Sequence, residues 1–85
     1  MISELLNFID HNVTKEKVNI DHFKPELVFV DIDYPKDKDK EIVLEIKDNI
    51  VGISLVEKKR IDFSGADELF YSLEEAQAYL MNLLD

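Results

Sequence analysis

The stretch that decides the fold is EIVLEIKDNIVGISLV, residues 41–56. On either side of Asp48-Asn49, apolar side chains recur at every second position, and this period is typical of β-strands. Asp and Asn are favoured in tight turns, so the pair predicts a hairpin in which Lys47 opposes Ile50. All pairs on one face are then apolar: Ile46 with Val51, Leu44 with Ile53, and Ile42 with Leu55.

A further strand precedes this hairpin, because the same alternation occupies residues 26–34. Pro35 and the charged residues 36–40 end that strand in a solvated loop, since five alternating charges cannot be buried. If Ile32 opposes Ile42 across the loop, the remaining pairs are apolar as well: Val30 with Leu44, and Val28 with Ile46. Three strands therefore agree on one core face, and a shift of one residue would destroy that agreement.

Helices are expected at both ends of the chain. Apolar residues at three- and four-residue spacing predict a helix over residues 3–12, with Ser3 as its N-cap. The S-x-x-E sequence of residues 72–75 predicts a capping box, with a reciprocal bond between Ser72 and Glu75, and an apolar stripe continues from it to Leu84. Each helix needs an apolar face to cover, and the sheet offers one.

The sequence therefore predicts one small acidic α+β domain over residues 1–85, in the order α-β-β-β-(β)-α. The expected sheet is an antiparallel meander of three to four strands, with the N- and C-terminal helices packed on one face. The uncertain fourth strand is Ile61-Asp62-Phe63. Residues 13–25 predict a loop with one helical turn, because Pro25 forces Lys24 out of helical geometry.

Composition narrows the classes of function. The chain has 19 Asp and Glu against 10 Lys and Arg, a net charge of −9, and 46% of its residues are hydrophobic. Such a hydrophobic fraction is ordinary for a globular protein. Direct binding to nucleic acid or to an anionic membrane is not expected of so negative a chain. The absence of cysteine excludes disulfides, thiolate metal clusters and cysteine catalysis.

Location and origin are also expectations at this point. No apolar run approaches the about 20 residues of a membrane span, and residues 1–4 lack the basic residues of a signal peptide. We therefore expect a cytoplasmic protein. Nine lysines against one arginine, together with many isoleucines, are typical of an AT-rich bacterial or phage genome.

Carboxylates are the abundant reactive groups, and a metal site built from Asp31, Asp33 and Glu41 is one hypothesis. An EF-hand is not expected, because counting from Asp31 places Lys36 where the loop needs glycine. Lysines interleaved among these acids favour a solvated hairpin tip instead. We expect no dedicated metal site and no cofactor.

The residues do not predict catalysis. The glycines lie outside any phosphate-binding loop, and no serine lies in a nucleophile-elbow sequence. His11 suits the end of a helix, where its charge complements the helix dipole. A pair formed by His11 and His22, as metal ligands or as a base, is an alternative. We expect a protein that is not an enzyme.

Charge is unevenly distributed along the chain. Residues 1–14 and 62–85 contain eight acids and no Lys or Arg, whereas residues 15–61 are nearly neutral. Such a one-signed surface steers and orients a basic partner. We therefore expect an inhibitor or immunity-type protein that binds a basic protein, for example one that itself binds nucleic acid, and the alternative is that these acids serve solubility and the helix dipole. The candidate partner-binding residues are Asp67, Glu68, Glu74 and Glu75.

The outer face of the sheet is a second candidate surface. In the expected register it carries apolar side chains among charged ones, and such clusters often mark association sites. Gly52 is expected to leave space for the ring of Phe29. Either a homodimer forms through this face or residues 13–25 fold over it. The candidate dimer residues are Leu27, Phe29, Val43 and Ile50.

Overall fold

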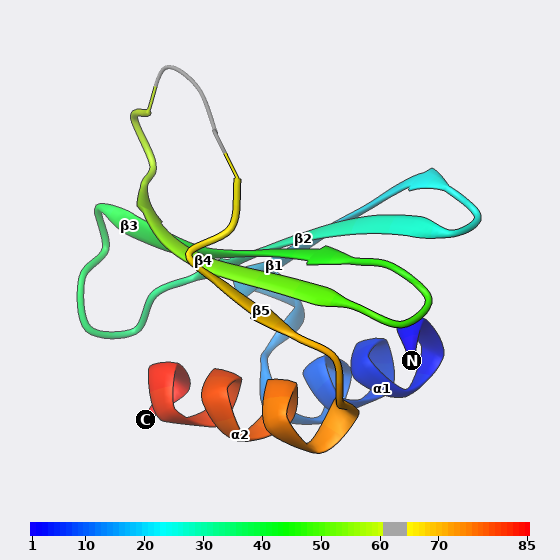
Figure 1. Ribbon diagram of the computed structural model, residues 1–85. Coiled ribbons are helices and arrows are strands. Elements are labelled where there is room, and N and C mark those ends of the chain that lie inside the picture. The colour runs from blue at the N-terminus through cyan, green and yellow to red at the C-terminus, as the bar shows by residue number, and fades with distance from the viewer. Residues whose placement is uncertain (61–64) are drawn as a thin grey trace.

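The protein is a sheet with two helices beneath it (Figure 1). The computed structural model describes residues 1–60 and 65–85. Within these residues the elements follow in the order α1 (Ile2–Asn12), a 3₁₀ turn η1 (Lys15–Lys17), β1 (Val18–Lys24), β2 (Leu27–Asp33), β3 (Lys40–Ile46), β4 (Val51–Glu57), β5 (Glu68–Phe70) and α2 (Leu73–Leu84). Neither helix is long and apolar enough to cross a membrane in the part of the chain that the structure describes.

All neighbouring strands are antiparallel, in the order β1-β2-β3-β4-β5. The α+β class, the meander and the terminal helices are confirmed. The hairpin turn is confirmed too, since the amide of Lys47 donates to the carbonyl of Ile50 at 2.9 Å. All predicted cross-strand pairs are present: Val28–Ile46, Val30–Leu44, Ile32–Ile42, Ile42–Leu55, Leu44–Ile53 and Ile46–Val51.

One apolar core lies between the sheet and both helices. β2, β3 and β4 contribute alternate residues to it, and each helix contributes two residues of its apolar stripe. The two helices also contact each other, so that they form a single layer. The buried core residues are Leu5, Ile9, Val28, Val30, Ile32, Ile42, Leu44, Ile46, Val51, Ile53, Ala76 and Leu80.

The helix starts differ in part from expectation. The prediction that Ser3 caps α1 is wrong, because the N-cap position is Met1 and no side chain caps that helix. At α2, the amide of Glu75 donates to Ser72 Oγ at 3.1 Å, as predicted. The hydroxyl of Ser72 then donates to Glu74 at 3.2 Å, so the reciprocal bond expected from Glu75 is not the one formed. Both arrangements place a carboxylate at the positive end of the helix dipole.

The prediction of a loop over residues 13–25 is wrong, although the single helical turn is present as η1. β1 follows that turn and pairs with β2 through the turn at Pro25 and Glu26. This edge strand lacks a covered face, and Ile20 remains 41% exposed. Because both of its faces contact solvent, polar residues occupy positions on each of them, and the two-residue period is lost.

A second unexpected strand, β5, completes the sheet, so that the described residues form five strands rather than three or four. It has three residues and pairs with the other edge of β4. Such a short element leaves too few positions for a period to be recognised. The strand expected at Ile61-Asp62-Phe63 lies outside the described residues.

The end of the β4–β5 connection packs on the outer face of the sheet, which is the face opposite the helices. The amide of Asp67 donates to the buried Ser54 Oγ at 2.9 Å, and the amide of Leu55 donates to Asp67 Oδ2 at 3.3 Å. A Cβ built on Gly52 would lie 2.6 Å from the Cβ of Ala66. The space at Gly52 is therefore occupied by the connection, and the prediction that it accommodates Phe29 is wrong.

We predict that Gly52→Ala destabilises the protein, because the added methyl group displaces Ala66 and the connection that it belongs to. Overpacking of this kind costs about 1–3 kcal/mol of unfolding free energy. The same substitution in an Ala66→Gly background should cost much less, since the obstructing Cβ is gone. Urea denaturation of the four proteins measures this coupling. An equal penalty in both backgrounds would contradict the packing described here.

Candidate protein-interaction surfaces

Two of the four predicted partner-binding residues lie in the first turn of α2. Glu74 and Glu75 are exposed, and the hydrogen bonds at Ser72 fix where the helix begins. Their negative charge also complements the positive end of the helix dipole. The local sequence thus accounts for both the helix start and the position of the two carboxylates.

The other two residues, Asp67 and Glu68, lie where the chain enters β5. The hydrogen bonds from Asp67 to β4 hold its backbone and its carboxylate in place. Glu68 pairs with Ile53 and is exposed. Burial raises the pKa of Tyr79 on α2, and the negative charges of Glu68 and Asp67 raise it further. Both carboxylates therefore act electrostatically on the helix that carries Glu74 and Glu75 at its start.

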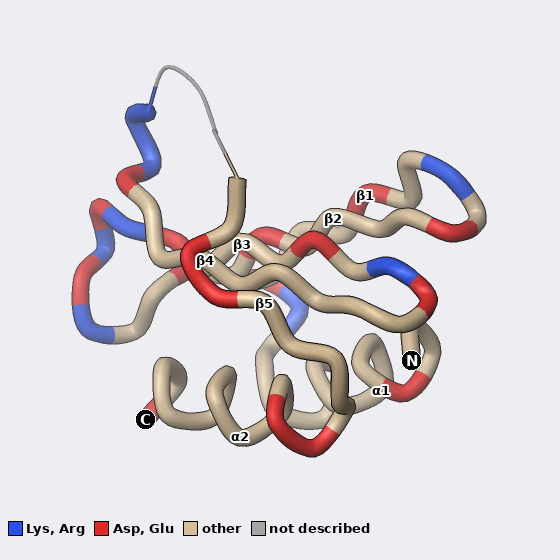
Figure 2. The backbone as a smooth tube through the Cα atoms, in the orientation of Figure 1, with Lys and Arg blue, Asp and Glu red and all other residues tan. Residues whose placement is uncertain are grey.

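Lys and Arg are confined to one part of the molecule, whereas acids occur throughout it (Figure 2). The helix layer and β5, together with the residues that flank them, comprise residues 1–14 and 65–85 and contain seven acids and no Lys or Arg. Every Lys and Arg belongs to residues 15–60, which form the 3₁₀ turn, the first four strands and their connections. The helix layer and β5 together thus carry acidic side chains without any Lys or Arg. We call Glu68, Glu74 and Glu75, with Asp67 at the outer-face end of the β4–β5 connection, the acidic surface.

The predicted dimer face is only partly exposed. Val43 is 4% exposed and belongs to the buried residues, so it is not available to a partner. Leu27, Phe29 and Ile50 are half-buried. The ring of Phe23 packs edge-to-face against that of Phe29, with 6.3 Å between their centroids, and Phe23 is still 60% exposed. Residues 13–25 thus add an edge strand to the sheet, and an exposed aromatic ring with it.

The sequence did not identify the exposed side chains Phe23, Leu69 and Tyr71 as surface features. Phe23 lies at a β-bulge, where the pairing of β1 with β2 shifts between His22 and Lys24. No sequence period marks such a shift. The role of Ser54 could have been predicted from the sequence. Gly52 and Ser54 are small residues on the same face of a buried strand, and such residues often mark the close approach of another segment.

Two of the three carboxylates of the hypothetical metal site, those of Asp33 and Glu41, form ion pairs with cations. Lys58 Nζ lies 3.0 Å from Asp33, and Arg60 Nη1 lies 3.4 Å from Glu41. No group of three or more acidic or histidine side chains is placed to hold a metal ion among the residues that the structure describes. The metal-site hypothesis therefore has no support in the geometry.

The two histidines lie on different elements. His11 is in the last turn of α1, and its Nδ1 donates to the carbonyl of Asn7 at 2.7 Å. His22 lies on β1 and pairs with Val28. The position of His11 at a helix end agrees with its expected role toward the helix dipole.

Comparisons with known proteins add no relative: the chain matches no protein-family model, no curated protein and no solved structure.

We predict that Asp31→Asn stabilises the protein at neutral pH. Burial raises the pKa of Asp31, and the charge of Glu41 adds to this effect while Arg60 opposes it. The folded state therefore binds the proton more tightly than the unfolded state, and the ionised carboxylate costs stability. The advantage of the variant should shrink as the pH falls from about 7 toward the ordinary Asp pKa of about 4, because folded wild type takes up the Asp31 proton at a higher pH than the unfolded chain does.

Urea denaturation across this pH range measures the effect, and Asp33→Asn is the control. That variant loses an ion pair with Lys58 and should gain no stability at neutral pH. An Asp31→Asn protein that is less stable than wild type at pH 7 would contradict the assignment.

Proposed function

We propose that this chain is a non-catalytic protein-binding module of the inhibitor or immunity type, acting through the acidic surface on a basic partner protein. The absence of Lys and Arg from residues 1–14 and 65–85, which form the helix layer and β5 with their flanking residues, carries the proposal. A partner with a basic patch, such as a surface that binds nucleic acid, is the complementary chemistry. Carboxylates presented at such a patch compete with phosphates for the same cations.

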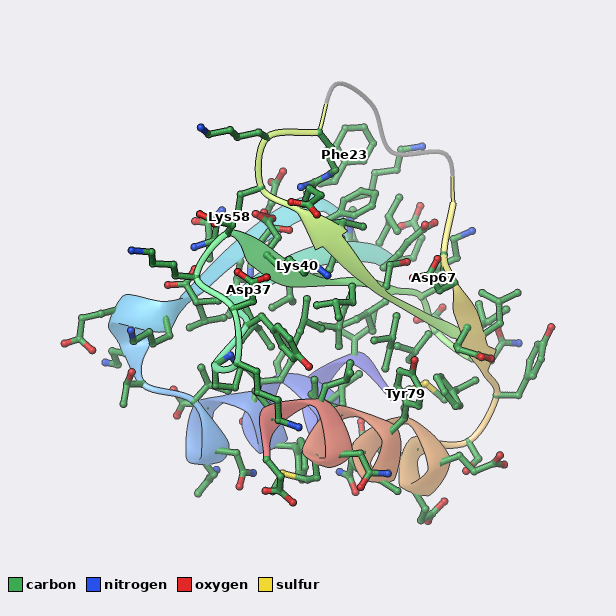
Figure 3. The ribbon with its side chains drawn as sticks, turned by 90° about the vertical axis from the view of Figure 1, so that its left-hand side faces the viewer. Phe23, Asp37, Lys40, Lys58, Asp67 and Tyr79 are labelled. Atoms are coloured by element: carbon green, nitrogen blue, oxygen red, sulfur yellow. The ribbon has the colours of Figure 1, made fainter. Side chains whose placement is uncertain are left out.

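Local structure supports this proposal by ordering the acidic surface before binding. The cap at Ser72 and the hydrogen bonds between Asp67 and β4 fix two of its segments. On α2, Tyr79 packs against Phe70 of β5, with 5.0 Å between the ring centroids. Figure 3 shows Tyr79 on the helix and Asp67 at the end of the connection. Ordered side chains lose less entropy on association, which improves affinity.

The small energy of each ion pair favours a role of the acidic surface in orienting the partner and in raising the rate of association. An isolated exposed ion pair contributes only about 0–1 kcal/mol. A one-signed surface acts collectively, because its field extends over about 8 Å at physiological ionic strength. Such a field raises association rates and disfavours acidic competitors.

The test is capture of a partner from a lysate of the source organism by the immobilised protein. Wild type should capture a basic protein at about 0.1 M salt and release it at about 1 M, where the screening length falls to about 3 Å. A Glu68→Gln, Glu74→Gln, Glu75→Gln variant should fail at both concentrations. Asp67 is left unchanged, because its carboxylate holds the amide of Leu55.

The matched control removes three acids elsewhere: Glu16→Gln, Glu26→Gln and Asp48→Asn, which are exposed residues between α1 and β4. This variant has the same net charge as the test variant and should capture the partner like wild type. Capture that survives both the three substitutions in the acidic surface and high salt would refute the electrostatic proposal. Equal loss of capture in both variants would mean that capture depends on the total charge of the protein and not on the acidic surface.

A second candidate is a homodimer through the outer face, and the 60% exposure of Phe23 beside Phe29 favours it. Sedimentation at increasing concentration should then show a dimer, and Phe23→Ser should convert it to a monomer. Tyr71→Ser removes another exposed aromatic ring and should leave the dimer intact. A wild-type monomer at the highest concentration excludes this candidate.

A further inference from the structure

A cavity of about 460 Å³ lies at the end of the molecule where both helices finish. Residues after α1, the last residue of α2, the end of β2 and the β2–β3 connection line it. Figure 3 is turned so that this end, with Asp37 and Lys58, faces the viewer. The volume lies within the range of about 300–1,000 Å³ that is typical of small-molecule sites.

The walls of this cavity combine apolar and polar side chains. Ile32 belongs to the buried core, and Val13 and Leu84 pack against that core while lining the cavity. Tyr34 and Pro35 add an aromatic ring and a pyrrolidine ring from the β2–β3 connection. A ligand that enters therefore exchanges water for apolar surface, which is favourable in proportion to the area buried.

The charge at the cavity opposes that of the whole molecule. Three lysines, Lys17, Lys38 and Lys58, line it together with one acid, Asp33. Lys58 is paired with Asp33 at 3.0 Å. Lys17 and Lys38 are exposed and form no ion pair with any other residue that the structure describes. Two ammonium groups at this cavity are thus free of ion pairs with described residues, although the net charge of the chain is −9.

Neighbouring hollows differ in this respect. The hollow at the opposite end of the sheet is lined by Lys24 and Lys47 but also by Glu26 and Asp48, so its charges balance. The hollow on the adjacent outer face is lined by four acids and two lysines, Glu16, Asp31, Asp33 and Glu41 with Lys17 and Lys58. Excess positive charge beside apolar walls therefore distinguishes the cavity between the helix ends from both.

We propose that this cavity binds a small carboxylic acid with an apolar body, the hydrocarbon lying against Val13, Tyr34 and Leu84 and the carboxylate at Lys17 and Lys38. An ammonium group binds a carboxylate through a charge-assisted hydrogen bond. The two lysines carry three donors each, and both are available because neither is engaged by a described carboxylate. This binding activity is separate from the acidic surface and does not depend on it.

The test is an NMR titration of the ¹⁵N-labelled protein with octanoate as the probe. Saturable shifts are expected at the amides of Val13, Thr14, Tyr34 and Leu84, which line the cavity. Shortening the probe to hexanoate and then to butanoate should weaken binding several-fold at each step, because fewer methylenes are buried. Shifts confined to other residues, or shifts that do not saturate, would overturn the proposal.

Two further probes distinguish the contribution of the carboxylate to binding from that of the alkyl chain. Neutral 1-octanol and inorganic phosphate should each bind at least tenfold more weakly than octanoate, since each supplies only one half of the recognition. If 1-octanol binds as tightly as octanoate, the lysines take no part and the proposal fails. If phosphate binds as tightly as octanoate, the apolar side chains take no part in binding and the proposal fails as well.

Substitutions locate the site. Lys17→Ala with Lys38→Ala should weaken octanoate binding about tenfold or more, because both charge-assisted bonds are lost. Lys24→Ala with Lys47→Ala is the matched control, with the same change in net charge at the opposite end of the sheet, and should bind like wild type. Lys58 is left in place because its removal would strand Asp33. Equal weakening in the two double variants would overturn the assignment.

Discussion

The packing of one apolar face across three strands is the constraint on which the rest of the structure depends. Val30, Leu44 and Ile53 are adjacent on β2, β3 and β4, and all three are fully buried. A slip of one residue between any two of these strands would turn a row of such side chains to the outer face. The helices are fixed by the same face, because their apolar stripes have no other surface to cover.

This arrangement separates three surfaces with different chemistry. The helices cover the inner face and present carboxylates without any base, while the lysines are confined to the rest of the chain. The β4–β5 connection occupies part of the outer face at Ala66 and Asp67, and the exposed ring of Phe23 lies beside Phe29 at the β1 edge. Where both helices end, lysines and apolar side chains line a cavity. The three proposed partners, which are a basic protein, a second copy and a small anion, thus correspond to separate parts of one small domain.

The sequence predicted those elements that have a covered face. β2, β3 and β4 were correctly paired because their inner positions, such as Leu44, are buried and their outer positions are mostly not. β1 was missed since Ile20 on its inner side is exposed and no two-residue period is imposed on it. The residues of the acidic surface were predicted from the distribution of charge along the sequence alone. The sequence could not predict that Asp67 is tied to Ser54, because that bond joins residues 13 positions apart through a loop.

The most direct test of this account is the strand register, measured by nuclear Overhauser effects between methyl groups. The account predicts cross-strand effects from Leu44 to Val30 and to Ile53, together with slowly exchanging amides in β2, β3 and β4. Effects that instead pair the methyl groups of Leu44 with those of residues on the outer face, such as Val56, would contradict it. The core and all three surfaces would then have to be assigned anew.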